Sequence, residues 1–248
     1  KRAMDKAEEL DFEYQIEAEL LHEFARHGAR HAAYNSIVAS GDNANILHYN
    51  DNCEPLNDGD LLLIDAGCEL AGYAADITRT FPINGKFTAE QKAIYELVLK
   101  SQLAAIEAIK PGANFAQLND IVGEVLTTGL FELGILKGEL LELIAENACK
   151  KYFIHGLGHW LGLDVHDVGK YLSKNNKSQA VKFTEGNVLT IEPGCYIRPS
   201  DHVSQEFWGI GVRIEDDVLV TPDGHDVLSK NAPKEINELE AIIGTSSA

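Results

Sequence analysis

Several carboxylates of this chain stand inside or beside apolar, β-like strings, and this placement constrains the fold more than any other feature. A carboxylate that enters a folded core needs a partner, because burying an unpaired charge is costly. The fold must therefore bring these carboxylates to a cation or to a basic side chain. The strings that carry them, with one glycine-rich string that carries histidines, are LLLIDAG (61–67), YAADITRTF (73–81), HGLGHWLGLDVHD (155–167), VLTIEPG (188–194) and VRIEDDV (212–218).

Five residues of these strings are candidate metal ligands: Asp65, Asp76, His159, Glu192 and Glu215. If they converge, four carboxylates and one imidazole can hold two divalent ions that share carboxylates. An oxygen-rich set suits Mn²⁺ or Mg²⁺, and the single imidazole leaves Zn²⁺, Co²⁺ and Fe²⁺ open. Two such ions can activate a hydroxide between them, so the set predicts a hydrolase.

Each candidate carboxylate also has a purely structural interpretation. Asp65 precedes a glycine and could serve a turn, while Asp76 could be an exposed polar residue of a strand over 73–81, in which even positions share a face. Glu192 is predicted at the end of a strand and Glu215 within one, where Arg213 shares its face. A salt bridge is therefore the alternative to a metal for both glutamates.

Three histidines, His155, His159 and His166, lie close together in the glycine-rich string. The first two have the spacing of ligands on one helical turn, but the intervening glycines disfavour a helix. Glycine instead favours a loop or a bulged strand whose backbone approaches a ligand closely. A single histidine is most often structural, and taken alone His48 in LHY has that interpretation.

Periodicity and end signals predict helices first, then strands, then helices, then strands and a last helix. The helices are predicted over 1–9, 14–27, 88–109, 115–133, 139–150 and around 236–242, with a strand over 61–64 and strands dominating from 155 to 220. Asp11 is the predicted cap of the second helix, and Thr88 with Gln91 is a predicted capping box. Runs of each element type, rather than strict alternation, predict an α+β fold with helices on one face of a curved antiparallel sheet.

Composition narrows the class of protein further. The 248 residues carry a formal net charge of −18, which argues against nucleic acid or an anionic membrane as the main partner. The four cysteines form no CxxC pair, so we interpret them as reduced thiols of a cytoplasmic protein. The chain opens with KRAMDKAEEL rather than with an initiator Met, as a fragment of a longer protein would.

Taken together, the strings resemble the creatinase/prolidase/methionine aminopeptidase superfamily, and most closely the bacterial Xaa-Pro aminopeptidases (aminopeptidase P). The shared strings are NILHY (45–49), LLLIDAGCELAGYAADITRTFPINGKFT (61–88), HGLGHWLGLDVHDVG (155–169), LTIEPGCYI (189–197) and GIGVRIEDD (209–217). They are long and specific and extend over nearly the whole chain. The resemblance implies the pita-bread fold with internal pseudo-symmetry, and residues 1–248 as its catalytic metallopeptidase domain, without the N-terminal domain that full-length members carry.

The resemblance also implies two divalent metal ions, with Mn²⁺ expected and Co²⁺ or Zn²⁺ as alternatives. Asp76, His159 and Glu215 would bind one ion, and Asp65, Asp76, Glu192 and Glu215 would complete the pair. A hydroxide between the ions would attack the bond between an N-terminal residue and a penultimate proline. The implied partners are thus peptides with proline at the second position, and the implied assembly of the full-length form is a homo-oligomer.

Roles around the ions follow from the same resemblance. Glu192 would move the proton, His166 would donate a hydrogen bond to the oxyanion, and Arg213 would orient a ligand carboxylate. His155 and His48 would position the substrate. Three alternatives stand beside this function: a prolidase that cleaves only Xaa-Pro dipeptides, an inactive binding module of the same fold, and metal-free creatinase-like hydrolysis. The last two require lost ligands, whereas all five are retained.

Overall fold

The computed structural model describes residues 1–173, 179–200 and 202–243. Its first part consists of a helical pair and antiparallel strands. These elements are α1 (Arg2–Lys6), α2 (Glu13–Arg26), β1 (His31–Ala32), β2 (Ile37–Ser40), the 3-10 helix η1 (Gly41–Asn45), β3 (Leu61–Ala66), β4 (Cys68–Leu70), β5 (Tyr73–Ala74) and β6 (Ile77–Pro82). Leu61 to Ala66 pairs in register with Ile77 to Pro82, so β3 and β6 form the longest ladder of this part.

The second part opens with two long helices and continues with short strands. These elements are α3 (Ala89–Glu107), α4 (Phe115–Glu132), α5 (Leu140–Ala145), η2 (Ala148–Lys151), β7 (Val188–Ile191), β8 (Gly194–Tyr196), η3 (Gln205–Phe207), β9 (Gly211–Arg213), β10 (Asp216–Val220), β11 (His225–Val227) and α6 (Ile236–Ile242). The predicted capping box begins α3, since Thr88 Oγ1 accepts from Gln91 N and Gln91 Oε1 accepts from Thr88 N.

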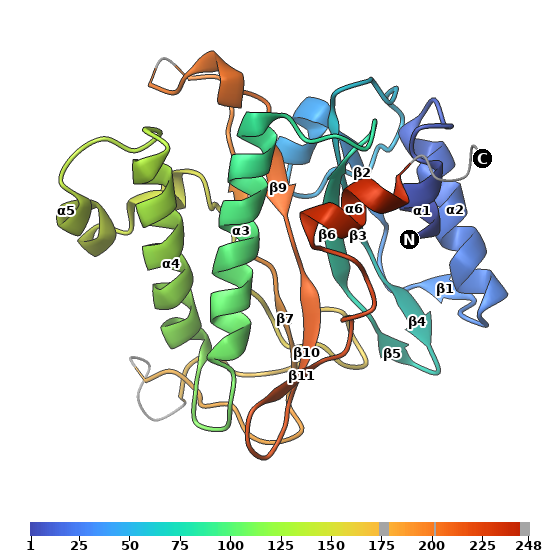
Figure 1. Ribbon diagram of the computed structural model, residues 1–248. Coiled ribbons are helices and arrows are strands. Elements are labelled where there is room, and N and C mark those ends of the chain that lie inside the picture. The colour runs from blue at the N-terminus through green and yellow to red at the C-terminus, as the bar shows by residue number, and fades with distance from the viewer. Residues whose placement is uncertain (174–178, 201, 244–248) are drawn as a thin grey trace.

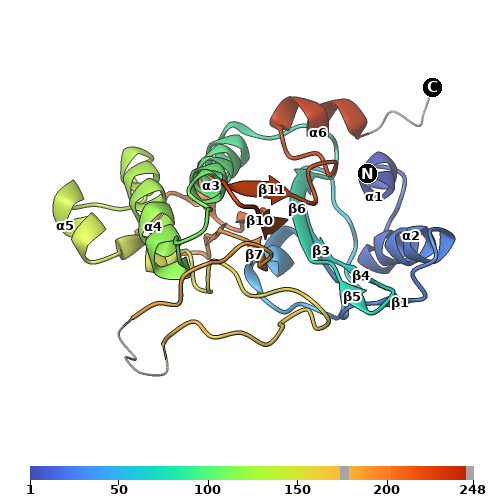
Figure 2. The ribbon, with the colours of Figure 1, turned by 90° about the horizontal axis from the view of Figure 1, so that it is seen from below.

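The strands form small antiparallel sheets in the orders β2-β3-β6, β11-β10-β7, β1-β4-β5 and β8-β9. A backbone bond from Glu215 N to Thr78 O (3.0 Å) connects β6 to the segment that enters β10. Figure 2 shows α4, α3 and α6 in an arc on one side of these strands, with α1 and α2 at its end, while residues 155–173 lie on the other side. This arrangement confirms the predicted α+β class.

One apolar core connects both parts. It extends from Met4 in α1 through Phe81 and Tyr95 to Val218, and it reaches Leu239 in α6. In Figure 1 α3 and α4 lie side by side, and α6 returns to the amino-terminal helices. This continuity supports the assignment of 1–248 as one domain, which stays a proposal.

Two local predictions about helices are wrong. Asp11 does not cap α2: the cap is Phe12, and the Gln15 side chain accepts from the backbone N–H groups of both residues. The helix predicted over 139–150 is interrupted at Asn147, whose φ of 56° lies in the left-handed region. The chain therefore forms α5 and, after that turn, the separate helix η2.

The sequence predicts longer strands than the structure contains. Among the described residues from 155 to 187, only isolated bridges occur, at Trp160 and between Leu172 and Ala180. Glycine and charged residues interrupt this stretch, so its backbone follows loops. Asp76, Glu192 and Glu215 also lie outside strands: each falls in the short interval between two of them.

Candidate metal centre

Asp65 and Asp76 are brought together by a close backbone approach at Gly67. Asp65 is the penultimate residue of β3, and Asp76 separates β5 from β6. A Cβ placed on Gly67 would lie 1.6 Å from Ala75 O, so only glycine permits this crossing. The two carboxylates then share one hydroxyl: Tyr34 OH lies 2.5 Å from an Oδ1 atom of each.

A second close approach, at Gly158, places His159. A Cβ there would lie 2.0 Å from Thr190 O, so the glycine allows the histidine string to run against β7. Backbone bonds from Thr190 N to His159 O (2.9 Å) and from Glu192 N to Leu157 O (2.8 Å) fix this pairing. The histidine string therefore runs alongside β7, and this brings His159 beside Glu192.

Glu215 is almost completely buried and is held by the neighbouring strand. Thr78 accepts its backbone N–H, and Thr78 Oγ1 donates to Glu215 Oε2 at 2.7 Å. The side chain therefore points from the start of β10 toward β6 and Asp76.

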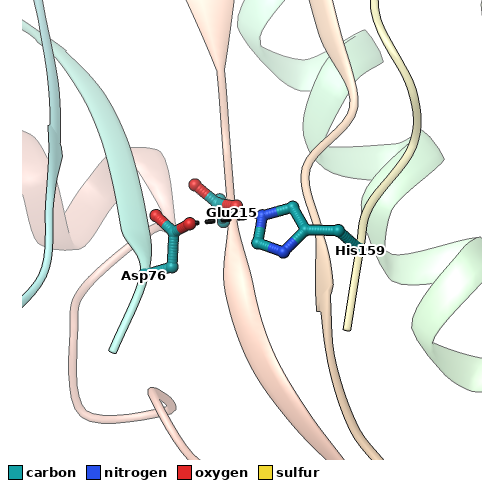
Figure 3. Close-up of side chains that lie close together, drawn as sticks. All are labelled: Asp76, His159 and Glu215. Atoms are coloured by element: carbon teal, nitrogen blue, oxygen red, sulfur yellow. Dashed lines mark ion pairs between the residues drawn. The ribbon is translucent and has the colours of Figure 1, made fainter. Parts of the chain in front are cut away.

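Donor atoms of Asp76, His159 and Glu215 all lie within 4.8 Å of one another, and Figure 3 shows the three side chains facing a common point. The Nδ1 atom of His159 is 3.0 Å from Trp160 O, which leaves Nε2 facing Asp76 (3.3 Å) and Glu192 (3.7 Å). A histidine that donates through one nitrogen to a carbonyl presents the other as a metal ligand. The carboxylates and this imidazole thus fit a divalent cation.

Arg213 supplies the buried positive charge of the site. Its guanidinium donates to Asp65 Oδ2 (2.7 Å), to Tyr196 OH (2.9 Å) and to Thr78 Oγ1 (3.2 Å). Through these contacts it fixes the orientation of Asp65 and, through Thr78, that of Glu215.

His155 belongs to a hydrogen-bonded chain that starts at Arg213. Tyr196 OH accepts from Arg213 and can therefore give its single proton to His155 Nε2, 2.7 Å away. The other ring nitrogen, Nδ1, is 2.7 Å from Gly156 O and 3.5 Å from Glu192 Oε2. Both nitrogens of His155 therefore have partners inside the protein.

The remaining histidines complete one cavity. The His166 ring packs against His159 with centroids 4.3 Å apart, and His48 enters from the loop between η1 and β3. The cavity has a volume of about 270 Å³, and its lining includes all nine predicted site residues: His48, Asp65, Asp76, His155, His159, His166, Glu192, Arg213 and Glu215. The structure thus brings the whole predicted set together, while the role of each residue stays a prediction.

Burial and neighbouring charges shift the ionisation of these groups. Burial raises the pKa of Glu192 to about 8 and, with Asp76, raises that of Glu215 well above its usual value. Burial also raises the pKa of Asp76, but hydrogen bonds from His159 and Tyr34 outweigh it and the net shift is downward. Burial would lower the pKa of His159, yet its bond to Asp76 makes the net shift upward. The two shifts favour an ionised Asp76 beside a protonated His159, so a positive charge already lies at the position suited to a cation.

Burial and the Arg213 charge lower the pKa of His155 to about 3, so this imidazole is neutral. Burial and His159 likewise lower the pKa of His166. Two neutral rings thus flank the acidic cluster.

Sequence reasoning missed three hydroxyls of the site: Tyr34, Thr78 and Tyr196. Thr78 shares the parity of Asp76 in its string, which was a usable signal, and Tyr196 lies in the LTIEPGCYI string. Nothing in the sequence around Tyr34 indicates that its hydroxyl meets two aspartates.

Four carboxylates and one histidine converge on one cavity of an antiparallel α+β fold. This arrangement indicates a metal-dependent hydrolase. Comparison with known proteins makes this specific: residues 1–222 match the model of metallopeptidase family M24, and the chain belongs to that family.

Individual relatives agree with this assignment. The chain is 54% identical over 242 residues to a Xaa-Pro aminopeptidase of Haemophilus influenzae, covering 98% of the chain and 55% of that protein. Aminopeptidase P from E. coli, solved with the inhibitor Pro-Leu, superposes with a TM-score of 0.93 at 50% identity, over 98% of the chain and 54% of its own. Proline aminopeptidase P II from Yersinia pestis gives 0.91 at 49% identity, over 97% and 56%.

These structures share the pita-bread fold, which confirms that prediction. The chain spans about half the length of the curated relatives it matches. Within the described ranges, no helix combines the length and apolar character that a membrane span requires.

Proposed function

We propose that this chain is the catalytic part of an Xaa-Pro aminopeptidase, which removes an N-terminal residue that precedes proline. The observation that carries the proposal is the single cavity lined by all nine predicted site residues. The similarity to Xaa-Pro aminopeptidases over 98% of the chain supports the choice of substrate. Peptides with proline at the second position are therefore the proposed partners.

Two divalent ions are proposed at the site, because five potential ligands exceed the needs of one. Asp76, His159 and Glu215 would hold one ion, and Asp65 with Glu192 would complete the second position beside the shared carboxylates. When bound, such ions would lower the pKa of the attacking water toward about 7 and polarise the scissile carbonyl. Mn²⁺ is the proposed metal, supported by the oxygen-rich donor set, with Co²⁺ and Zn²⁺ as alternatives.

Glu192 is proposed to accept the proton of the attacking water and to deliver it to the leaving prolyl nitrogen. Its carboxylate lies at the cavity wall within 3.7 Å of His159 Nε2, and burial makes it a stronger base than an exposed glutamate. His155 is proposed to position the substrate around the scissile bond. It lines the same cavity, and its Nδ1 lies 3.5 Å from Glu192 Oε2.

His166 and His48 line the part of the cavity that a peptide can reach, and both side chains are exposed. His166, whose pKa is lowered by partial desolvation and by the neighbouring His159, is proposed to donate a hydrogen bond to the developing oxyanion. His48 is proposed to position the peptide substrate around its scissile bond. Arg213 holds Asp65 in position and offsets part of the acidic charge.

The deciding experiment measures hydrolysis of an Xaa-Pro-Xaa tripeptide and of an Xaa-Pro dipeptide, with metal content determined in the same samples. Activity should be lost with a chelator and return with Mn²⁺, Co²⁺ or Zn²⁺. Cleavage of the dipeptide alone would make the protein a prolidase. Full metal occupancy without cleavage of either peptide would indicate an inactive binding module.

The compartment and assembly remain proposals as well. All four cysteines are free, which supports a reducing, cytoplasmic environment. A homo-oligomer is proposed for the full-length form, and light scattering of that form would test it.

A further inference from the structure

A second buried carboxylate, outside the acidic cluster, accepts an unusual number of hydrogen bonds. Glu13, the first residue of α2, has no exposed surface. Its Oε1 accepts from Ser40 N (2.7 Å), Ser40 Oγ (2.8 Å) and Asn43 Nδ2 (3.1 Å). Its Oε2 accepts from Tyr49 OH (2.7 Å) and Glu54 N (3.0 Å).

The donors to Glu13 all belong to one segment, residues 40–54, which leaves β2 and returns toward β3. The backbone strengthens this attachment, because Glu13 N donates to Glu54 O at 3.1 Å. Asn52 attaches the same segment to β2 and to the residue before it. Its Oδ1 accepts from Val38 N and its Nδ2 donates to Ser36 O, both at 2.9 Å. The segment is therefore anchored at both ends and at its middle.

The middle of this segment lies at the candidate metal centre. Leu47 and His48 line its cavity, and Tyr49, the next residue, is buried and turned back to Glu13. The side chain of Tyr49 thus anchors the backbone one residue from the imidazole that faces the cavity.

We propose that Glu13 is a positioning residue of the peptidase: it holds segment 40–54 and thereby sets the place of His48 at the cavity. The catalytic consequence, though not the positioning itself, depends on the proposed function. All five atoms that contact the Glu13 carboxylate donate hydrogen bonds to it. A glutamine has one acceptor oxygen, so its NH₂ group would face a backbone N–H in either orientation, that of Ser40 or that of Glu54.

Glu13→Gln is therefore the informative variant, with Glu17→Gln, partly exposed one turn further along α2, as its matched control. We expect Glu13→Gln to lower kcat/KM for an Xaa-Pro tripeptide about 10- to 100-fold, because small displacements of a substrate-positioning group have effects of this order. The control should stay within about twofold, and bound metal should be unchanged in both. Tyr49→Phe removes one of the five bonds and should lower kcat/KM about threefold to tenfold, which provides a milder variant if Glu13→Gln folds poorly.

A double-mutant cycle separates positioning from general structural damage. In a His48→Ala background, Glu13→Gln should cost less than about threefold, because the group it acts through is gone. In a His166→Ala background it should keep its full effect. An equal loss in both backgrounds would overturn the proposal.

A readout independent of activity completes the test. With ¹³C-labelled histidine, the His48 ring resonance should shift in Glu13→Gln while that of the exposed His202 does not. The amides of Ser40 and Glu54 should exchange hydrogen faster. An unchanged His48 resonance with unchanged exchange would refute the positioning role, whereas a parent chain inactive on peptides would refute only the proposed function.

Discussion

Replacing Arg213 by methionine tests the electrostatic design of the metal centre without relying on catalysis. The change keeps an unbranched apolar stem and deletes the guanidinium. Three hydrogen bonds disappear with it, to Asp65, Tyr196 and Thr78. The Asp65 carboxylate then keeps the hydrogen bond from the Tyr34 hydroxyl, but it stays beside the like charge of Asp76.

The expected loss of stability is large. Removing one partner of a buried ion pair typically costs about 3–5 kcal/mol, because the other charge remains buried. For a chain of this size, each kcal/mol corresponds to about 2–4 °C, so the unfolding midpoint should fall by roughly 6–20 °C. Arg26→Met is the control: its ion pair with Glu23 lies at the surface, where salt bridges contribute little, so its unfolding midpoint should stay close to that of the parent.

The loss should depend on pH in a defined direction. Burial already raises the pKa of Asp65, and Arg213 is the neighbour that lowers it most. Without Arg213, the pKa of Asp65 in the folded protein rises further above its unfolded value. A carboxyl group with a raised folded pKa destabilises increasingly above its unfolded pKa of about 4, so the deficit of the variant should grow with pH and shrink on acidification.

The assay is urea unfolding of parent, Arg213→Met and Arg26→Met in a chelator between pH 5 and 8, repeated with saturating Mn²⁺. Bound cations would place positive charge beside Asp65, so the deficit of Arg213→Met should be smaller with metal. A loss below about 1 kcal/mol in the chelator would refute the argument. A deficit that does not change with metal would indicate that Asp65 lies outside the ligand set.

Three further predictions address catalysis and metal binding. Glu192→Gln should lower turnover about 10²- to 10⁴-fold with an unchanged circular dichroism spectrum, and turnover near that of the parent would exclude Glu192 as the proton shuttle. His166→Ala should slow turnover about 10²- to 10³-fold with full metal occupancy; parallel loss of metal, measured in the same preparation, would make His166 a ligand instead. Because the raised pKa values of Glu192, about 8, and Glu215 keep protons on the metal-free site, affinity for Mn²⁺ should increase from pH 6 to 8 with proton release, and calorimetry that finds neither would contradict this.

Local signals in the sequence were sufficient for the long helices. Thr88 with Gln91 marks the start of α3, and Asn114 caps α4 by accepting from Gln117 N. These signals act within a few residues, so a sequence displays them directly. The break at Asn147 could not be predicted in the same way, because a left-handed residue other than glycine depends on its tertiary surroundings.

The candidate site was predictable in its residue types but not in its supporting contacts. A carboxylate in an apolar string is visible as an anomaly, and this selected Asp65, Glu192 and Glu215. Glu13 has no such mark: an acidic residue in the first turn of an amphipathic helix is ordinary, since it interacts favourably with the helix dipole. Only the fold shows that its carboxylate meets five donors.

The predicted continuous strands were wrong for a reason that explains the site itself. Within a strand, a side chain is confined to one of two faces by the pleat. Asp76, Glu192 and Glu215 each occupy an interval of two residues between strands, where the backbone leaves the ladder and can aim a carboxylate at a common point. The glycines Gly67 and Gly158 then allow the backbones of the facing segments to come close to each other.

The two parts of the chain contribute unequally to that point. The first supplies Asp65 and Asp76, and the second supplies His159, Glu192 and Glu215. The bond from Glu215 N to Thr78 O and the ion pair of Arg213 with Asp65 cross between them. Because neither part alone holds both sides of the Asp76, His159 and Glu215 cluster, binding of a cation there must stabilise the association of the two parts, and with it the folded state as a whole.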